Sequence, residues 1–512
     1  MASATSGSQS LANSITTWVS QYQSSLQSEL VAPVQTKQAQ LQSRLAALSA
    51  LSSQLMVLRD SASAISKSDS TSEFSAYSVS NSDSSVVQSN ATSSAVVGNH
   101  TLFVSQIAQA DTIISSRFTS SSTGIVSNEL TSDEKTAGSA TRQINILVGG
   151  NQVATVDVPL TWSPDADTNA TVLSSIASAI NGSSDASQYV TASVVSVTPT
   201  QSRLVVTSKT TGSSNAISLE DVGSGTLLAN IGLGSSVMSG RNAASTGTTP
   251  DDPIDNPGGY LIGGDTGLLD AKFTLDGIDF ERPSNTVSDA LTGVTFTLQA
   301  SQAQNDSPVT LGVGLNTSQI QGNVQSFLSA YNSVINTIQS QTAINTTTGA
   351  TQIFSSDSFI KDIKNQLASI VINAIPGLDV GSNLLSSVGI TRGSDGTLTI
   401  SDSAAFTNAL TTSPTEVSNL FNSSQGLGSQ INTYLATVVG PTGTSGTTGE
   451  MNSIQSSVND QITTLTKNLS TINASINKQV QNYQDELAQL QVAYEQGTEQ
   501  LTFIQQFMPI TG

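Results

Sequence analysis

The stretch that decides the fold is MNSIQSSVNDQITTLTKNLSTINASINKQVQNYQDELAQLQVAYEQ, residues 451–496, which contains no glycine and no proline. Its apolar residues recur only at intervals of three and four positions, as on one face of an α-helix. They are Ile454, Val458, Ile462, Leu465, Leu469, Ile472, Ile476, Val480, Tyr483, Leu487, Leu490 and Tyr494. A helix this long with so narrow an apolar stripe is not stable alone. We therefore expect it to pack against helices of the same chain or of other subunits.

The N-terminal region supplies candidate partner helices. Its first apolar stripe consists of Leu11, Ile15, Trp18, Tyr22 and Leu26, again at intervals of three and four. We expect Pro33 to interrupt this helix and to lie in the first turn of the next one. That second helix carries leucines from 41 to 58 and is predicted to end near residue 60. Both ends of the chain are thus predicted to be helical, and their stripes must meet to be buried.

The middle of the chain has the alternating pattern of β-strands. Residues 143–148 and 153–158 predict a hairpin around Gly149-Gly150, and residues 272–275 and 278–280 predict another around Asp276-Gly277. A helix with Val172, Ile176 and Ile180 on one face is expected at 172–180, before two further strands at 191–197 and 203–208. Helical periodicity returns from about residue 318.

This layout predicts an α+β fold. We expect an elongated molecule, with a coiled-coil-like helical stalk and legs built from both termini and with β-rich head domains inserted between them. Four domains are predicted: a terminal helical leg (1–32 with 451–512), a helical stalk (33–72 with 308–450), a β-rich head (73–115 with 270–307) and a second, inserted β-rich head (116–269).

Composition narrows the classes of function. The formal net charge is −20, which disfavours binding to nucleic acid. The absence of cysteine excludes disulfides, thiolate zinc sites and cysteine nucleophiles. His100 is the only histidine, so a histidine-based triad or metal cluster would depend on one residue. The acidic loop containing Asp251, Asp252 and Asp255 is interpreted as solvated rather than as a calcium site. We therefore predict no enzyme activity, no metal and no cofactor.

The sequence also bears on location. The first residues contain neither a basic region nor an apolar core, so no cleavable signal peptide is expected. No apolar run reaches 18 residues, so no membrane span is expected. These observations leave open a cytoplasmic protein or an export route that does not use a cleaved signal.

A motif between residues 280 and 298 has the most specific likeness to a known family. The matching positions are Arg282, Ser284, Asn285, Asp289, Gly293, Val294, Thr295 and Leu298. Weaker matches lie at 32–34 with the leucine-rich helix after it, at 100–110, at 327–332 and at 389–398, and residues 169–219 are similar to an Ile-Asn repeat of flagellar axial proteins. In this order the matches span nearly the whole chain. The sequence resembles the flagellar filament cap family (hook-associated protein 2, FliD).

The resemblance implies a secreted structural protein at the distal tip of a bacterial flagellum. It implies a homo-oligomeric ring, most often of five subunits, that retains exported flagellin and promotes its folding and insertion. The five residues of the N-terminal stripe and the eight stripe residues from Leu465 to Leu490 would contact the filament or other subunits. Further implied partners are the hook–filament junction protein, the flagellar type III export apparatus and an export chaperone at the C-terminal helix, where Gly497 could loosen the helix.

Other interpretations of the same sequence remain. The stripes alone are equally typical of a coiled-coil stalk or of a self-dimer. The chain could be another axial protein, either flagellin or a hook–filament junction protein, although the 282–298 motif favours the cap. It could also be a secreted hydrolase, for which no catalytic cluster is visible, or an adhesin with a helical stalk. A cap whose heads also adhere to host surfaces is a further possibility.

Overall fold

The computed structural model describes residues 2–163, 168–235, 238, 260–261, 266–344, 351–443 and 448–507. The chain forms two compact units, residues 1–75 with 317–512 and residues 76–316. The first unit is mainly helical and the second is built mainly from antiparallel sheets, which confirms the predicted α+β class. The four-domain division stays a prediction, and Asp251, Asp252 and Asp255 lie outside the described residues.

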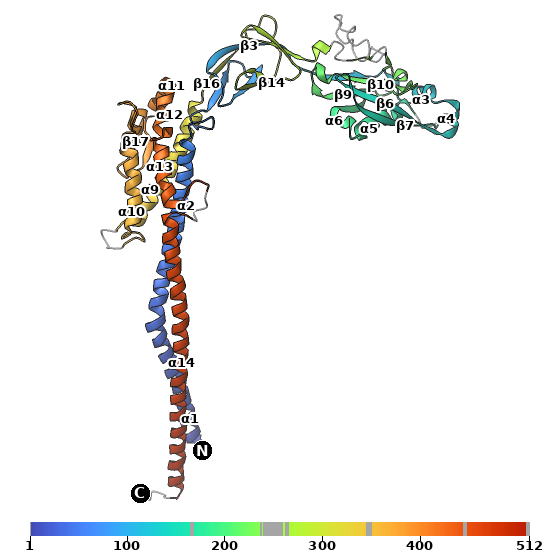
Figure 1. Ribbon diagram of the computed structural model, residues 1–512. Helices are drawn as coiled ribbons and strands as arrows, with labels where there is room; N and C mark the ends of the chain where they lie inside the picture. The colour runs from blue at the N-terminus through green and yellow to red at the C-terminus, as the bar shows by residue number, and fades with distance from the viewer. Residues whose placement is uncertain are drawn as a thin grey trace. The chain divides into compact units, whose positions relative to one another are not determined.

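Long helices from both ends of the chain dominate the first unit. Helix α1 (Ala2–Leu26) is followed by the π-helical turn η1 (Gln27–Val31) and by α2 (Ala32–Ile65), and the C-terminal helix is α14 (Glu450–Phe507). Helices α1 and α14 run antiparallel and side by side (Figure 1). Helix α14 continues through Gly497 without a break. The end predicted near residue 60 for the second helix was too early, because α2 continues to Ile65.

The core of the first unit forms around the second half of α2. Leu48, Leu51 and Leu55 have no exposed surface, and α2 contacts α9 and α13. The remaining elements are α9 (Thr317–Thr342), α10 (Ser358–Ile372), η5 (Leu385–Val388), β17 (Ile390–Arg392), β18 (Leu398–Ile400), α11 (Ser403–Thr412), α12 (Pro414–Asn422) and α13 (Leu427–Val439). The buried Arg59 of α2 donates hydrogen bonds of 2.8 Å to the carbonyls of Gly440 and Pro441, and so fixes the chain where α13 ends.

The second unit contains a first β-rich core made of two sheets. One sheet has the order β1 (Tyr77–Asn81), β16 (Val309–Leu315), β3 (Gly98–Gln106), β12 (Ala271–Leu275) and β13 (Ile278–Arg282). The other has the order β14 (Thr286–Leu291), β15 (Val294–Leu298) and β2 (Val87–Ala91). Phe273 and Phe296 pack edge to face in this core, with ring centroids 5.5 Å apart.

The predicted β12–β13 hairpin is confirmed. Asp276 and Gly277 form its turn with φ values of +52° and +80°, the left-handed conformations that a two-residue hairpin turn requires. The Asp276 carboxylate accepts a 2.8 Å hydrogen bond from the Thr101 N–H and lies 2.7 Å from Nδ1 of His100. These contacts lower the pKa of Asp276. His100 therefore takes part in holding this turn against β3.

A second β-rich core lies between residues 110 and 235. One sheet has the order β11 (Tyr260–Leu261), β4 (Ala110–Ile114), β9 (Gln201–Thr211) and β5 (Phe118–Thr119). Strand β8 (Val190–Thr198) also pairs with β9 in this sheet. The other sheet has the order β10 (Ile217–Asp221), β6 (Ser139–Val148) and β7 (Asn151–Thr161). Helices α3 (Gly124–Glu129), α4 (Ser132–Ala137), α5 (Asn169–Gly182), α6 (Ala186–Tyr189) and α7 (Leu227–Asn230) and the turn η2 (Ser213–Asn215) complete it, and η4 (Thr266–Leu268) precedes β12.

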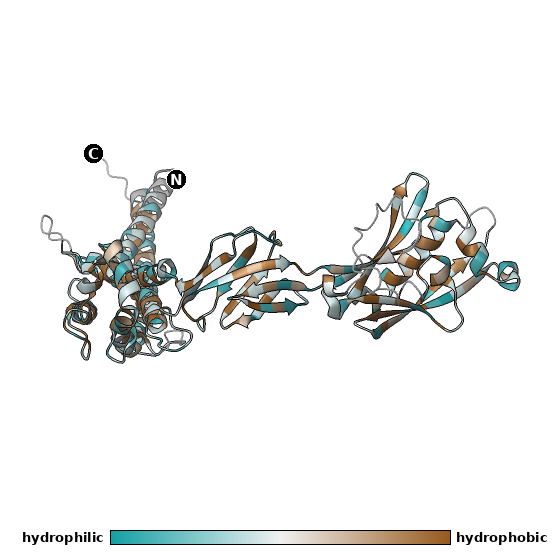
Figure 2. Cartoon of the chain, turned by 90° about the horizontal axis from the view of Figure 1, so that it is seen from above, coloured by the Kyte–Doolittle hydropathy of each residue, from teal (hydrophilic) through white to brown (hydrophobic). Residues whose placement is uncertain are grey.

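Local sequence explains this second core. The predicted β6–β7 hairpin turns at Gly149 and Gly150, whose φ values are +58° and +81°. Helix α5 buries Val172, Ile176 and Ile180, the three residues of its predicted apolar face. Hydrophilic and hydrophobic residues alternate along the strands, as Figure 2 shows, because successive side chains point to opposite faces of a sheet.

A charged network closes one end of the second core. Arg142 of β6 donates to Glu129 over 2.6 Å and to Glu134 over 2.9 Å. The Glu129 side chain is 1% exposed, whereas that of Glu134 is 30% exposed. Hydrogen bonds from Arg142 and from the backbone of Thr131 lower the pKa of Glu134 to about 2. The ionised Glu134 is therefore the form that the folded chain favours.

This network predicts acid sensitivity of the second core. Because the pKa of Glu134 is lower in the folded chain than its ordinary value of 4.5, its contribution to stability is complete above about pH 4.5 and is lost as the pH falls toward 2. The urea midpoint, followed by Trp162 fluorescence in a Trp18→Phe background, should fall over this range. The fall should be smaller in Glu134→Gln, and an identical fall in both proteins would contradict the assignment.

Candidate functional site

Helices α1 and α14 meet along an apolar contact that we call the leg seam. Its buried residues are Val19, Val31, Ile476, Val480 and Leu487, and Ile15, Tyr22, Leu26, Leu469, Ile472 and Tyr483 pack against them half-buried. The rings of Tyr22 and Tyr483 lie 4.7 Å apart between centroids. The C-terminal stripe therefore finds a partner within the same chain, one of the two arrangements expected from its sequence.

Four of the predicted contact residues lie outside this seam: Leu11, Trp18, Leu465 and Leu490. Trp18 is 42% exposed and Leu490 is 55% exposed. Val19, and not Trp18, is buried between Ile15 and Tyr22. Both residues fit a helical face, because the intervals from Ile15 to Leu26 are 4, 3 and 4 with Val19 and 3, 4 and 4 with Trp18. Leu11 and Leu465 are half-buried. Some of the predicted filament contacts are therefore buried or half-buried between α1 and α14, and others remain exposed on the single chain.

The C-terminal part of α14 exposes further large apolar side chains. Val492, Tyr494, Leu501, Phe503 and Ile504 are all between 48% and 62% exposed. At about 100° per residue, Leu490, Tyr494, Leu501 and Ile504 fall on one face of the helix, which we call the distal apolar surface, whereas Val492 and Phe503 fall on the opposite side. Scattered apolar residues are normal on a protein surface, whereas several exposed on one helical face are typical of an interaction surface.

The 282–298 motif builds part of the first β-rich core. Arg282 ends β13, and its guanidinium pairs with the Asp289 carboxylate of β14 at 3.0 Å while lying 5.4 Å from the ring centroid of Phe280. This pairing lowers the pKa of Asp289. The side-chain oxygen of Ser284 accepts a hydrogen bond from the Thr286 N–H, which shapes the entry into β14. The two charged residues of the motif therefore join strands that follow one another in the sequence and belong to the two different sheets of this core.

Asn285 makes three hydrogen bonds that link separate segments of the chain. Its side-chain oxygen accepts a 2.7 Å hydrogen bond from the Ala108 N–H, and its side-chain nitrogen donates over 2.9 Å to the Ala108 carbonyl. Its own carbonyl accepts from the Leu298 N–H at 2.8 Å. Asn285 thus joins the chain leaving β3 to the β14–β15 hairpin. A side-chain amide is suited to this position because it both donates and accepts.

The rest of the motif fills or turns the hairpin. Gly293 has a φ of +72°, and a Cβ there would lie 2.4 Å from the Ala95 nitrogen, so only glycine fits. Val294 and Leu298 are buried in the core, and Thr295 lies between them half-buried. These contacts hold the backbone of the hairpin in place, which is a structural role.

Asn285→Ala should weaken the attachment of the chain at Ala108 to the β14–β15 hairpin. The variant removes the hydrogen-bond partner of both the N–H and the carbonyl of the buried Ala108, which costs about 1–3 kcal/mol. We expect hydrogen exchange at the Ala108 amide to become at least tenfold faster, measured by NMR or mass spectrometry on the full chain. Ser284→Ala, which removes one exposed acceptor, is the control and should leave this amide nearly unchanged.

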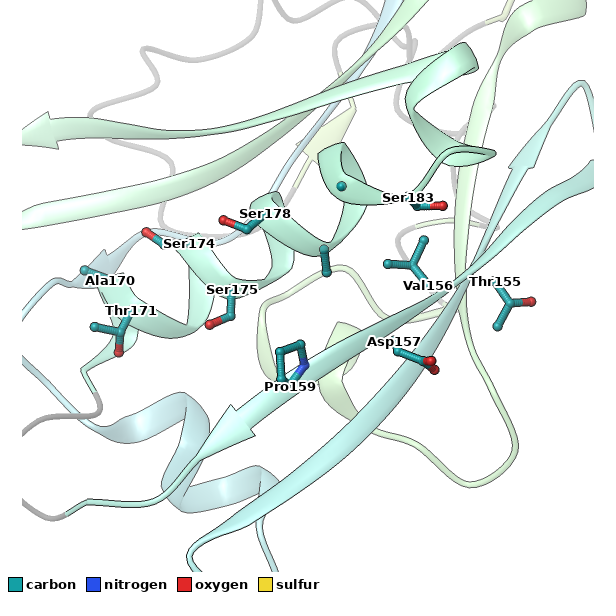
Figure 3. Close-up of a pocket in the computed structure, with 12 residues that line it drawn as sticks. Thr155, Val156, Asp157, Pro159, Ala170, Thr171, Ser174, Ser175, Ser178 and Ser183 are labelled. Carbon is teal, nitrogen blue, oxygen red and sulfur yellow. The ribbon is translucent and has the colours of Figure 1, made fainter.

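The second core also carries an open groove of about 880 Å³ between α5 and β7. Figure 3 shows that small side chains line it, among them Ser174, Ser175 and Ser178 from the helix and Pro159 from the strand. Its one carboxylate, Asp157, accepts a 2.7 Å hydrogen bond from Gln143. Within the described ranges, no three His, Asp or Glu residues are grouped to hold a metal ion, and none of the described helices is long and apolar enough to cross a membrane.

Comparison with known proteins identifies the chain's relatives. The model of the flagellar hook-associated protein 2 N-terminus matches residues 13–111, and that of the C-terminus of the same protein matches residues 269–499. Flagellar hook-associated protein 2 of Escherichia coli strain K12 is 28% identical over 478 residues, which cover 91% of this chain and 90% of the relative. The chain belongs to the flagellar hook-associated protein 2 family. Its members cap the flagellar filament, and this chain is therefore a flagellar filament capping protein.

Two further relatives support the hook-associated protein 2 assignment. The A-type protein of Pseudomonas aeruginosa is 30% identical over 206 residues, covering 39% of this chain and 40% of the relative. The crystal structure of the D1-D2-D3 domains of the flagellar cap protein FliD from Escherichia coli superposes with a TM-score of 0.54 at 25% identity. That match covers 81% of this chain and 99% of the crystallised one. The family is one of structural flagellar cap proteins.

The two hook-associated protein 2 models leave residues 112–268 unmatched. That interval holds almost the whole second β-rich core. The matched parts, by contrast, contain the leg seam and the whole 282–298 motif. The two family models therefore cover the leg helices and the first core, and the second core lies between them in the sequence.

Proposed function

We propose that this capping protein forms a ring with further copies of itself at the flagellum tip, most often of five subunits. The ring retains exported flagellin and promotes its folding and insertion as the filament elongates. The observation that carries the proposal is the helix pair α1–α14. Its seam holds the two termini together, while Trp18 and the distal apolar surface remain uncovered on the single chain. Burial of these side chains against other subunits or the filament would stabilise the assembly.

The same proposal extends to the route by which the protein reaches the tip. We assign its export to the flagellar type III apparatus without a cleaved signal. Before export, an export chaperone would cover the distal apolar surface of α14. After export, the cap would first contact the hook–filament junction protein. The low content of charged residues, 11% of the chain, is compatible with close packing against other protein subunits.

Deletion of the encoding gene tests the function directly. We expect cells that do not swim, that lack filaments and that release unpolymerised flagellin into the medium, with all three properties restored by the wild-type gene on a plasmid. Flagellin in the medium is measured by immunoblot and filaments are counted by electron microscopy. Normal filaments in the deletion strain would overturn the proposed function.

A further inference from the structure

The helix at the N-terminus changes its winding once, at the π turn Gln27–Val31. Leu26 before the turn and Ala32 after it both have ordinary α-helical backbone angles. The Ala32 N–H donates to the Gln27 carbonyl, five residues back instead of four. The interruption predicted at Pro33 is therefore a wider turn within one continuous helical run, and not a break.

Pro33 favours this turn, although it does not by itself require it. Proline has no N–H to donate, and inside an α-helix its ring meets the carbonyl four residues earlier, here that of Glu29. The wider π turn immediately before Pro33 moves this carbonyl away. Pro33 thus alters the winding of the helix one turn before its own position.

The register of the leg seam is a second reason for the turn. The seam residues Leu26 and Val31 are five positions apart, which in an α-helix would turn Leu26 about 140° away from the face of Val31. One residue absorbed by a π turn reduces this to about 40°. Without the turn, each position of the seam in α1 would fall on the next residue of the sequence. The seam would then receive Thr16, Ser20, Gln23 and Gln27 in place of Ile15, Val19, Tyr22 and Leu26. The apolar seam therefore depends on the π turn.

Packing becomes tight only in the second half of α2, because most residues from Ala32 to Gln40 are exposed. Farther along α2, Leu48, Leu51 and Leu55 are completely buried. Among the residues of α1 whose burial is described, Val19 is the most buried at 7% exposed, and Ile15 and Tyr22 are only half-buried. Fewer buried apolar contacts mean a smaller free energy of local opening. Helix α1 is thus held more weakly than the second half of α2.

We propose that Gln27–Val31 is a joint at which α1 separates from α14 as a unit while α2 stays packed. The α-helical hydrogen-bond ladder is already altered at the turn, so α1 can leave without unwinding α2. Such a joint would free the apolar face of α1 for contact with other subunits of the cap or with the filament, a use that rests on the proposed function.

Hydrogen exchange on the purified full chain tests the joint. In the wild type, amides of residues 10–26 should exchange at least tenfold faster than those of residues 41–58. Removal of Ser28 together with Pro33→Ala makes the helix continuous and keeps both apolar stripes in register. Opening of α1 must then disturb α2, so exchange at 10–26 should slow by about tenfold or more.

Pro33→Ala alone is the matched control. It retains the five-residue spacing from Leu26 to Val31, so the π turn and the fast exchange of α1 should persist. Equal exchange of α1 and α2 in the wild type, or unchanged exchange in the continuous variant, would overturn the joint. The measurement needs neither flagellin nor a filament, so its outcome is independent of the proposed capping function.

Discussion

Arg142→Leu should lower the free energy of unfolding of the second β-rich core by about 3 kcal/mol. Breaking a buried ion pair by removing one partner costs about 3–5 kcal/mol, because the remaining charge stays buried without compensation. The Glu129 side chain is 1% exposed and lies 2.6 Å from Arg142. Thr226 and Asn230 also donate to Glu129, at 2.8 and 2.7 Å, and would still do so in the variant. This is why we expect the lower end of the range.

Urea unfolding measured through Trp162 checks this value. The chain has two tryptophans, so a Trp18→Phe background leaves Trp162 as the reporter, and Trp162 packs against the second core with Lys135 5.1 Å from its ring centroid. Glu134→Gln, at the exposed end of the same network, should lose much less stability. Arg142→Leu combined with Glu129→Leu should recover part of the loss, because no unpaired charge remains. Equal losses for Arg142→Leu and Glu134→Gln would contradict the ranking.

Ile476→Asp should abolish filament formation. Ile476 is 1% exposed at the centre of the leg seam. A carboxylate at this position would be buried against apolar side chains without a partner, a cost that the half-buried seam residues of α1 cannot offset. We therefore expect α1 to separate permanently from α14. A strain that expresses this variant should swim no better than the deletion strain and should release as much flagellin.

Ala474→Asp is the matched control for this experiment. It adds the same charge to the same helix two residues earlier, at an exposed position. We expect cells with this variant to swim and to build filaments. Immunoblots of whole cells should show equal amounts of both variants. Equal motility of the two strains would show that the leg seam is not needed for capping.

Much of the architecture could be predicted from local patterns. The β-hairpins at Gly149-Gly150 and Asp276-Gly277 were predicted because a two-residue turn with positive φ needs such residues. The face of α5 was predicted because its apolar residues have a helical period. The family was suggested by the spacing of one motif, from Arg282 to Leu298, which the family comparison then confirmed. In each case the information lies within about twenty residues.

The distinction between Trp18 and Val19 could not be predicted in this way. Both satisfy the helical period, and the surface of α14 decides which of them is buried. The sequence did not indicate the role of Glu129, and it identified Asn285 as a motif residue without its contacts. Glu129 meets Arg142 across 13 residues, and Asn285 meets Ala108 across 177. No local pattern records which distant group a polar side chain will meet.

The π turn shows how the two levels of information combine. The sequence by itself determined that the N-terminal region is helical and that Pro33 disturbs it, because proline lacks an N–H and its ring meets the carbonyl four residues earlier. Only the tertiary structure decided how the helix responds. Packing against α14 requires Leu26 and Val31 on one face, and a single π turn is the change in winding that brings them there.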